Sequence, residues 1–153
     1  MAMATRFNLE RVKHNFSEVV KRDLPVLLAN QAKNFFAQAW QKQGFDDGGV
    51  IPWAVPQRRI PGTAAYRYPA GRDLGRRTRA TLVKSGRLRR AVQNSVREVR
   101  FEYIRLVVEV PYAMYHNKGT GTLPRREFMA DSRTLRRMQI EKISATIDKI
   151  WKE

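Results

Sequence analysis

The sequence predicts an α+β fold, in which a long N-terminal helix and a C-terminal helix pack on a small antiparallel β-sheet. Two patterns predict it. Apolar residues recur at intervals of three and four near both ends of the chain, and they alternate with polar residues in the run 104–110. The first spacing puts apolar side chains on one face of a helix, and the second puts them on one face of a strand. The 153 residues are expected to form one domain, 1–153, with one core.

The N-terminal helix is expected over residues 9–22, with Asn8 as its cap. A second helix should follow almost directly, with Asp23 as its cap and Pro25 in its first turn. Gly44 suits the left-handed position that ends a helix. We therefore expect a long helical element with a break or bend near residues 23–25.

Residues 46–77 carry most of the glycine and proline of the N-terminal half. A stretch this long without regular structure is uncommon in a compact domain, so we expect a flexible, functional loop. Pro52 and Trp53 are expected to anchor its start, because an indole is large enough to hold a loop against the helices.

The sheet is expected from segments between residues 78 and 110. Residues 78–83 form a short strand candidate, and 85–88 a turn that leads into one turn of helix. Residues 91–100 fit a helix and a strand equally well. In 104–110 the apolar residues Ile104, Leu106, Val108 and Val110 share one face. The edges of so small a sheet are exposed, and a ring of identical subunits is one way to cover them.

The chain returns to helix from Asp131 to Trp151. Asp131 and Ser132 can cap this helix. Four isoleucines at three- and four-residue spacing give it an apolar stripe: Ile140, Ile143, Ile147 and Ile150.

The charge is strongly basic, with 30 Lys and Arg against 14 Asp and Glu and a net charge of +16. Between Arg58 and Arg90, eleven basic residues stand against Asp73 alone, a net of +10. Such a block repels itself unless a negatively charged partner neutralises it. Two interpretations stay open: binding to a polyanion or an acidic protein face, or a solvated loop that keeps the protein soluble.

The stretch 107–132 organises the chain. A strand ends at Pro111, which suits the first position of a short helix over residues 112–117, and Gly119 can end that helix. His116 lies at the helix end, where an imidazole can bond free carbonyl groups and meet the negative end of the helix. Residues 118–122 are expected to form an exposed loop. Phe128 and Met129, which follow it, are expected to form a second apolar anchor.

This stretch resembles the virion-morphogenesis, or tail-completion, proteins of tailed bacteriophages and Mu-like prophages. The resemblance lies in Pro111-Tyr112-Ala113, His116-Asn117, Gly119, Pro124, Arg125 and Phe128-Met129. In those proteins a Pro-x-Arg-x-Phe ending closes the loop, whereas here an arginine follows the proline directly. Further matches follow in the family's order: Asn34-Phe35-Phe36, Gln43-Gly44-Phe45, Pro52-Trp53 and residues 82–88.

The resemblance implies a structural protein of the virion tail or neck, made in the bacterial cytoplasm, that completes the tail or joins it to the head. Its expected partners are other tail or head–tail connector proteins and further copies of itself, in a ring such as a hexamer. The family pattern also favours a strand over residues 91–100. The resemblance implies a docking edge formed by Tyr112, His116, Asn117, Gly119, Pro124, Arg125 and Phe128.

The alternative function is a basic protein that binds nucleic acid without sequence preference. A basic arm would carry it: Arg58, Arg59, Arg67, Arg72, Arg76, Arg77 and Arg79. Tyr66 and Tyr68 lie among these cations, as in proteins that stack single-stranded bases, although an arm that orders at a protein interface is the favoured interpretation. No zinc spacing or clear helix-turn-helix accompanies the charge.

We expect no enzyme, cofactor or metal site. The chain has no cysteine and two histidines, His14 and His116. Asp46-Asp47-Gly48-Gly49 lacks the other ligand positions of a calcium loop, and no phosphate-binding Gly-x-x-x-x-Gly-Lys-Ser/Thr motif occurs. No apolar run approaches the roughly 18 residues of a membrane span, so no membrane contact is expected.

Overall fold

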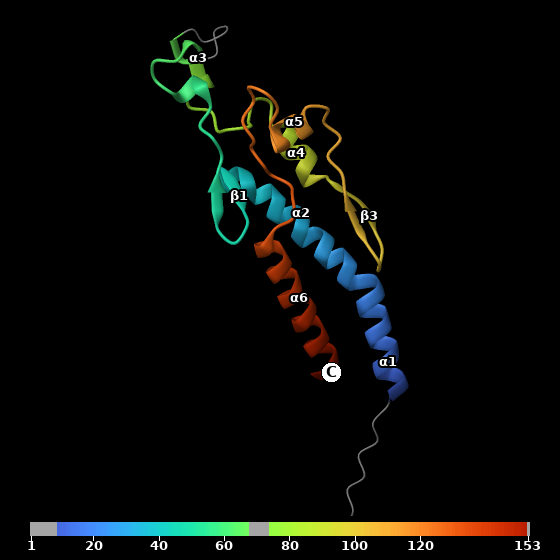
Figure 1. Cartoon of the computed structure of the whole chain (residues 1–153). Helices are drawn as coiled ribbons and strands as arrows, with labels where there is room; N and C mark the ends of the chain where they lie inside the picture. Colours follow the sequence, from blue (N-terminus) through green and yellow to red (C-terminus); the bar gives the residue numbers. More distant parts are fainter. Residues whose placement is uncertain (1–8, 68–73, 153) are drawn as a thin grey trace, which may run out of the picture.

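One long helix is the axis of the molecule (Figure 1). The computed structural model describes residues 9–67 and 74–152, so Asn8 lies outside the described residues. The axis consists of α1 (Leu9–Glu18), a π-helical turn, η1 (Val19–Asp23), and α2 (Leu24–Lys42). In η1 the N–H of Leu24 donates to the carbonyl of Val19, five residues back. Pro25 has no N–H to donate, and the wider turn lets the helix continue through it.

The ends of α2 differ from the prediction in two details. Asp23 makes no side-chain cap, because the helix runs through it without interruption. Gln43, and not Gly44, adopts the left-handed conformation that ends the helix, with φ of 49°. Gly44 is needed for another reason: a Cβ there would lie 2.4 Å from the carbonyl oxygen of Ile51 on the paired strand.

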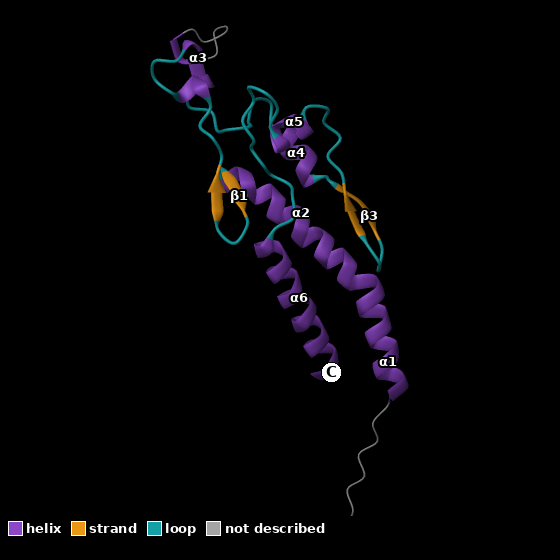
Figure 2. Cartoon of the chain, viewed as in Figure 1, coloured by secondary structure: helices purple, strands orange, loops and turns teal. Residues whose placement is uncertain are grey.

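The strands form two separate antiparallel hairpins and not one sheet (Figure 2). In the first, β1 (Gly44–Asp46) pairs with β2 (Val50–Pro52), with Phe45 opposite Ile51. In the second, β3 (Val96–Val99) pairs with β4 (Ile104–Leu106), with Val99 opposite Ile104. Both hairpins contact α2. The predicted fold class, helices packed on small antiparallel strands, is confirmed. The strands lie in two sheets and not one, the first of them outside the predicted region 78–110, and the strand predicted over 104–110 ends at Leu106.

Residues 78–83 are turns, so the strand predicted there is wrong. Leu82 has a φ of +58°, which no strand accommodates. The Thr81 N–H donates to the side-chain oxygen of Gln43, 2.8 Å away, in place of a strand partner. The following helix, α4 (Arg87–Gln93), is longer than the one turn expected. It includes Val92, so residues 91–93 are helical and only 96–99 form the favoured strand.

The segment 46–77 is less irregular than predicted. Besides β2 it holds two 3₁₀ turns, η2 (Gln57–Arg59) and η3 (Leu74–Arg76), and a single turn of helix, α3 (Ala64–Arg67). Within it, the Thr63 hydroxyl accepts a hydrogen bond from the Tyr66 N–H and donates one to the Gln57 carbonyl. Figure 1 shows α3 at one extremity of the molecule, away from α1 and α6.

The core lies where α2 meets the loops that flank the hairpins. Trp53 is buried as predicted, and its ring lies edge-on to Trp40 with centroids 5.6 Å apart. Phe128 also packs against Trp40, with ring centroids 5.3 Å apart. Phe35 contacts both Phe36 and Phe45 in edge-to-face geometry. These aromatic contacts hold the 53–56 and 126–129 segments together against α2.

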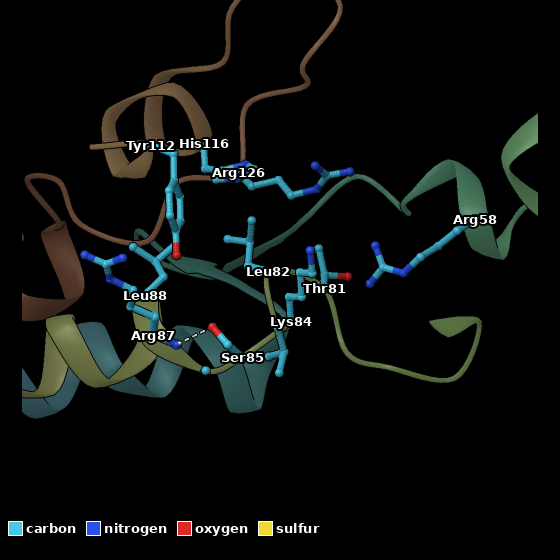
Figure 3. Close-up of a pocket in the computed structure, with 12 residues that line it drawn as sticks. Arg58, Thr81, Leu82, Lys84, Ser85, Arg87, Leu88, Tyr112, His116 and Arg126 are labelled. Carbon is cyan, nitrogen blue, oxygen red and sulfur yellow. Dashed lines mark hydrogen bonds between the residues drawn. The ribbon is translucent and has the colours of Figure 1, made fainter. Parts of the chain in front are cut away.

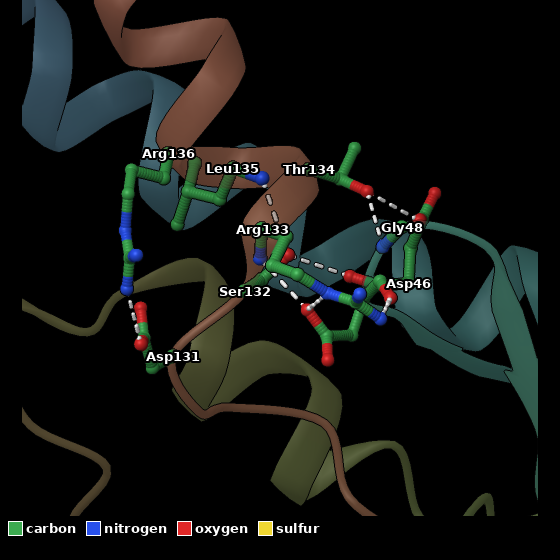
Figure 4. A network of polar contacts seen from close by, with 9 residues as sticks. Asp46, Gly48, Asp131, Ser132, Arg133, Thr134, Leu135 and Arg136 are labelled. Carbon is green, nitrogen blue, oxygen red and sulfur yellow. Dashed lines mark hydrogen bonds and ion pairs between the residues drawn. The ribbon is translucent and has the colours of Figure 1, made fainter.

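The C-terminal helix, α6 (Arg133–Lys152), is anchored at its first turn (Figure 4). Ser132 caps it as predicted, because its hydroxyl accepts from the Leu135 N–H at 3.1 Å and donates to the Asp46 carbonyl at 2.6 Å. The Asp47 carboxylate accepts from the Arg133 N–H at 2.8 Å. The tip of the first hairpin therefore serves as the N-terminal cap of a helix 86 residues further along the chain.

Beyond this anchor α6 runs back along α2 and α1, as Figure 1 shows. Leu135 is its one buried residue, and Ile143, Ile147 and Ile150 are half-buried. Ile140 is 58% exposed and Trp151 is 64% exposed. None of the residues of α1 is buried. The apolar stripe predicted for α6 exists, but none of its four isoleucines is fully buried by the described part of the chain.

Candidate functional site

The short helix α5 (Ala113–Lys118) is positioned by the residues on both sides of it. Val110 and Ala113 are buried in the core and fix its start. Asn117 fixes its end: its side-chain oxygen accepts from the N–H groups of Phe128 and Met129, at 2.8 and 3.1 Å. Its amide nitrogen donates to the Met129 carbonyl at 2.8 Å. These three bonds attach the helix to the segment that returns from the loop.

The loop after α5 closes on itself. Gly119 has a φ of +75°, and a Cβ there would lie 2.8 Å from the backbone nitrogen of Arg125. Thr120 and Leu123 exchange backbone hydrogen bonds of 3.0 and 2.7 Å. The Arg126 N–H then donates to the His116 carbonyl at 2.8 Å. This bond places the Arg126 side chain next to His116.

A pocket of about 380 Å³ lies between α5 and the turn 81–88. Figure 3 shows Tyr112, His116 and Arg126 on one side and Leu82, Lys84 and Leu88 on the other, with Arg58 further along. The Tyr112 and His116 rings lie edge to face, 5.9 Å apart. Two residues of the predicted docking edge therefore line a real concavity, together with residues from a segment about thirty positions earlier.

Four cationic side chains line this pocket, from Arg58, Lys84, Arg87 and Arg126, and the described lining includes no acidic residue. Arg126 is 7% exposed. Its Nε donates to the Ala54 carbonyl at 3.0 Å, and no carboxylate in the described part of the chain lies within ion-pair distance. Burial lowers the pKa of its guanidinium from the usual value.

The two half-buried titratable groups of the pocket, His116 and Arg58, also have no carboxylate partner among the described residues. Burial, followed by the charge of Arg126, lowers the pKa of His116. His116 Nδ1 has no hydrogen-bond partner among the described residues, so the imidazole does not cap α5; the Gly119 N–H does so by donating to the Tyr115 carbonyl. Arg58 donates to the carbonyls of Arg76, Arg79 and Ala80. Burial and neighbouring guanidinium groups, Arg76 first, lower its pKa.

The other predicted docking residues have different surroundings. Phe128 is a core residue and presents no surface to a partner. Arg125 is exposed and pairs with Glu127. Pro124 lines a second cavity, of about 620 Å³, which lies between residues 55–60 and 122–126 and shares Arg58 and Arg126 with the first. The sequence indicates Lys84 and Arg87 only as members of the basic block 58–90, and Arg126 only as the end of the loop that begins at Gly119; residue spacing does not bring the three to one pocket.

The basic arm is partly folded back on itself. The Arg77 guanidinium lies over the Tyr66 ring, 4.2 Å from its centroid, and donates to the Tyr66 carbonyl at 2.6 Å. Arg76 lines the second cavity, and Arg79 is bonded through its N–H to the Gly75 carbonyl. Arg59 and Arg67 are exposed. Arg72 and Tyr68 lie outside the described residues.

Within residues 9–67 and 74–152, no group of three or more His, Cys, Asp or Glu side chains could hold a metal ion. In the same ranges no helix has both the length and the apolar character required to cross a membrane.

No family model matches this chain, and no curated protein or solved structure matches it either. The resemblance to tail-completion proteins therefore depends on the motifs in the sequence, and the function it implies stays a prediction.

Proposed function

We propose that this chain is a structural assembly protein of a tailed phage or prophage, which completes the tail or joins it to the head. It acts by self-association and by docking on other tail or connector proteins. The motifs from Pro111 to Met129 support the phage assignment, and the uncovered apolar surface of the long helices supports assembly.

The observation that carries the proposal is the poor burial of α1 and α6. A helix in water is stabilised mainly by packing of its apolar face. Yet α6 buries one residue of its 20, and α1 buries none of its ten. Leu9, Phe16, Ile140 and Trp151 are exposed along these helices. Isolated two-stranded hairpins are also marginal in water. A second copy of the chain would cover both the apolar faces of these helices and the open edges of the hairpins.

The test is the native mass in solution, measured by light scattering over a range of protein concentrations. We expect closed oligomers, and we expect Ile140→Glu to shift the protein toward monomer because a carboxylate at the covered surface is desolvated. Val55→Glu, at an exposed apolar position outside the helices and both hairpins, is the matched control and should leave the mass unchanged. A monomer at all concentrations, with no effect of either variant, would contradict self-association.

The docking edge is tested in the phage that encodes the chain. We expect Tyr112→Ala and His116→Ala to give heads and tails that form but do not join. Electron microscopy of lysates distinguishes this result from loss of either structure. Normal yields of infectious particles from both variants would contradict the proposed role of this edge.

The second candidate function is sequence-independent nucleic-acid binding. The exposed cations Arg59 and Arg67 in the arm favour it. Such binding should weaken steeply with salt, because bound cations are released from the phosphates. Arg59→Gln with Arg67→Gln should then reduce both the affinity for a duplex and its salt dependence. Binding that is unchanged in this double variant would remove the basis of the second function.

A further inference from the structure

The pocket between α5 and the turn 81–88 has an excess of positive charge that the described chain does not neutralise. Arg126 is the central group, because it is buried and lacks a carboxylate partner within the described residues. A buried, unpaired charge is costly in a protein interior. Lys84 and Arg87 add two exposed cations at the rim. An anion bound in the pocket would provide the missing counter-charge.

The pocket also has an apolar side. Leu82, Val83 and Leu88 line it, and Leu88 belongs to the core. Figure 3 shows Leu82 across from Arg126 and beside the ring of Tyr112. The backbone of Leu82 lies in the left-handed region, with a φ of 58°, which is strained for a residue with a Cβ. Backbone strain of this kind tends to occur at binding sites. The ligand that fits is therefore an anion with an apolar group beside it.

The size and shape favour a protein segment over nucleic acid. A volume of about 380 Å³ is that of a small ligand pocket, whereas phosphates of nucleic acid are bound along an extended groove. Arg126 is buried and His116 is half-buried, so neither side chain projects from the surface as a cation that contacts a phosphate backbone does. One face of the Tyr66 ring in the basic arm is already covered by Arg77, so that face does not stack on a base.

We propose that this pocket binds an acidic peptide segment of a partner protein. One carboxylate of the segment pairs with Arg126, in the geometry that a guanidinium offers to two oxygens, and Lys84 and Arg87 attract it at the rim. A neighbouring apolar side chain rests on Leu82 and Leu88. This inference rests on the proposed assembly function and specifies the chemistry of the partner that docks there.

The test uses a fluorescein-labelled peptide of alternating Leu and Glu, and the same peptide with Gln in place of Glu. Binding to the full chain is measured by fluorescence anisotropy at about physiological ionic strength. We expect saturable binding of the acidic peptide alone. Lys84→Gln and Arg87→Gln, both at exposed positions, should each weaken it about tenfold. Arg89→Gln, an exposed cation on α4 that does not line the pocket, is the matched control and should bind normally.

Arg126→Met should abolish the binding, provided that circular dichroism shows the variant to be folded. If it does not fold, the two rim variants decide. Equal binding of the two peptides would overturn the proposal, and so would equal binding of the acidic peptide by the rim variants and the wild type. The proposal would also fail if millimolar inorganic phosphate displaced the labelled peptide, or if an oligonucleotide displaced it at a lower concentration than unlabelled peptide does. Light scattering of the rim variants separates the two proposals, because loss of peptide binding with intact self-association leaves the assembly function standing.

Discussion

At the scale of single residues, the stretch 111–129 contains side chains with two different tasks. Asn117, Gly119 and Phe128 hold the stretch in shape through hydrogen bonds, close backbone approach and core packing. Tyr112, His116 and Arg126 face the pocket. The same short motif therefore holds both a scaffold and a candidate binding surface, and substitutions in it should separate into effects on stability and effects on binding.

Gly119→Ala should destabilise the protein by about 2–3 kcal/mol, because the added Cβ meets the backbone of Arg125 and the conformation is strained for any other residue. Gly121→Ala is the control: its φ of +49° is also left-handed, but nothing lies within 4 Å of the added Cβ. That variant should lose about 1 kcal/mol. Urea unfolding measures both, and equal losses would show that the contact with Arg125 has no influence.

His116 should make stability depend on pH. Its pKa is lowered in the folded protein, mainly by burial, so the unfolded chain takes up the proton first as the pH falls. The free energy of unfolding is then highest above the usual histidine pKa of about 6.5 and decreases as the pH falls from there to the lowered pKa. Thermal melts of the wild type and His116→Gln from about pH 7.5 to 5 measure this.

The His116→Gln variant should lack this component of the pH dependence. His14→Gln, which changes an exposed histidine on α1, should keep it. If His116→Gln showed the same slope as the wild type, the decrease would have to come from other groups.

At the scale of elements, the N-terminus of α6 shows how the fold connects distant segments. Ser132 is a local cap, whereas Asp46, Asp47 and Gly48 reach the same turn from the first hairpin. The hydrogen bonds from Lys42 and then Thr134 lower the pKa of Asp46. These contacts of Asp46, Asp47 and Gly48 with residues 132–134 form a clamp. Because the clamp holds the one end of α6 that is anchored in the core, the position of the whole helix depends on it.

Ser132→Ala should cost about 1–2 kcal/mol, because it removes the cap of Leu135 and the bond to the Asp46 carbonyl. Ser144→Ala, at an exposed position within α6, is the control and should change stability by less than about 0.5 kcal/mol. Amide hydrogen exchange should show faster exchange along α6 in Ser132→Ala only. Unchanged exchange would mean that the other contacts of the clamp suffice.

At the scale of the whole molecule, the charge of +16 opposes the compact state. Salt screens such repulsion over about 10 Å at 0.1 M. We therefore expect the melting temperature to rise between low salt and about 0.3 M sodium chloride. Arg59→Gln with Arg67→Gln should reduce the rise, and Glu141→Gln, which adds net positive charge at an exposed site on α6, should increase it. A melting temperature independent of salt in all three proteins would contradict this account.

The sequence by itself determined the long helices, their apolar faces, the cap at Ser132, the burial of Trp53 and the fold class. These features follow from periodicity and from residues within one or two turns of each other. It also located the stretch 111–129, in which Tyr112 and His116 are separated by one helical turn and therefore lie on one face.

Only the tertiary structure decided which distant segments meet. Residues 78–83, predicted as a strand, are turns, and residues 81–83 form part of one wall of the pocket. The hydrogen bond to the Gln43 side chain and the left-handed backbone of Leu82 take the place of strand pairing there. The tertiary structure brought Arg126, Lys84 and Arg87 to one concavity and assigned Phe128 to the core. Residue spacing carries no information on contacts between segments tens of residues apart, since these depend on how the whole chain packs on α2.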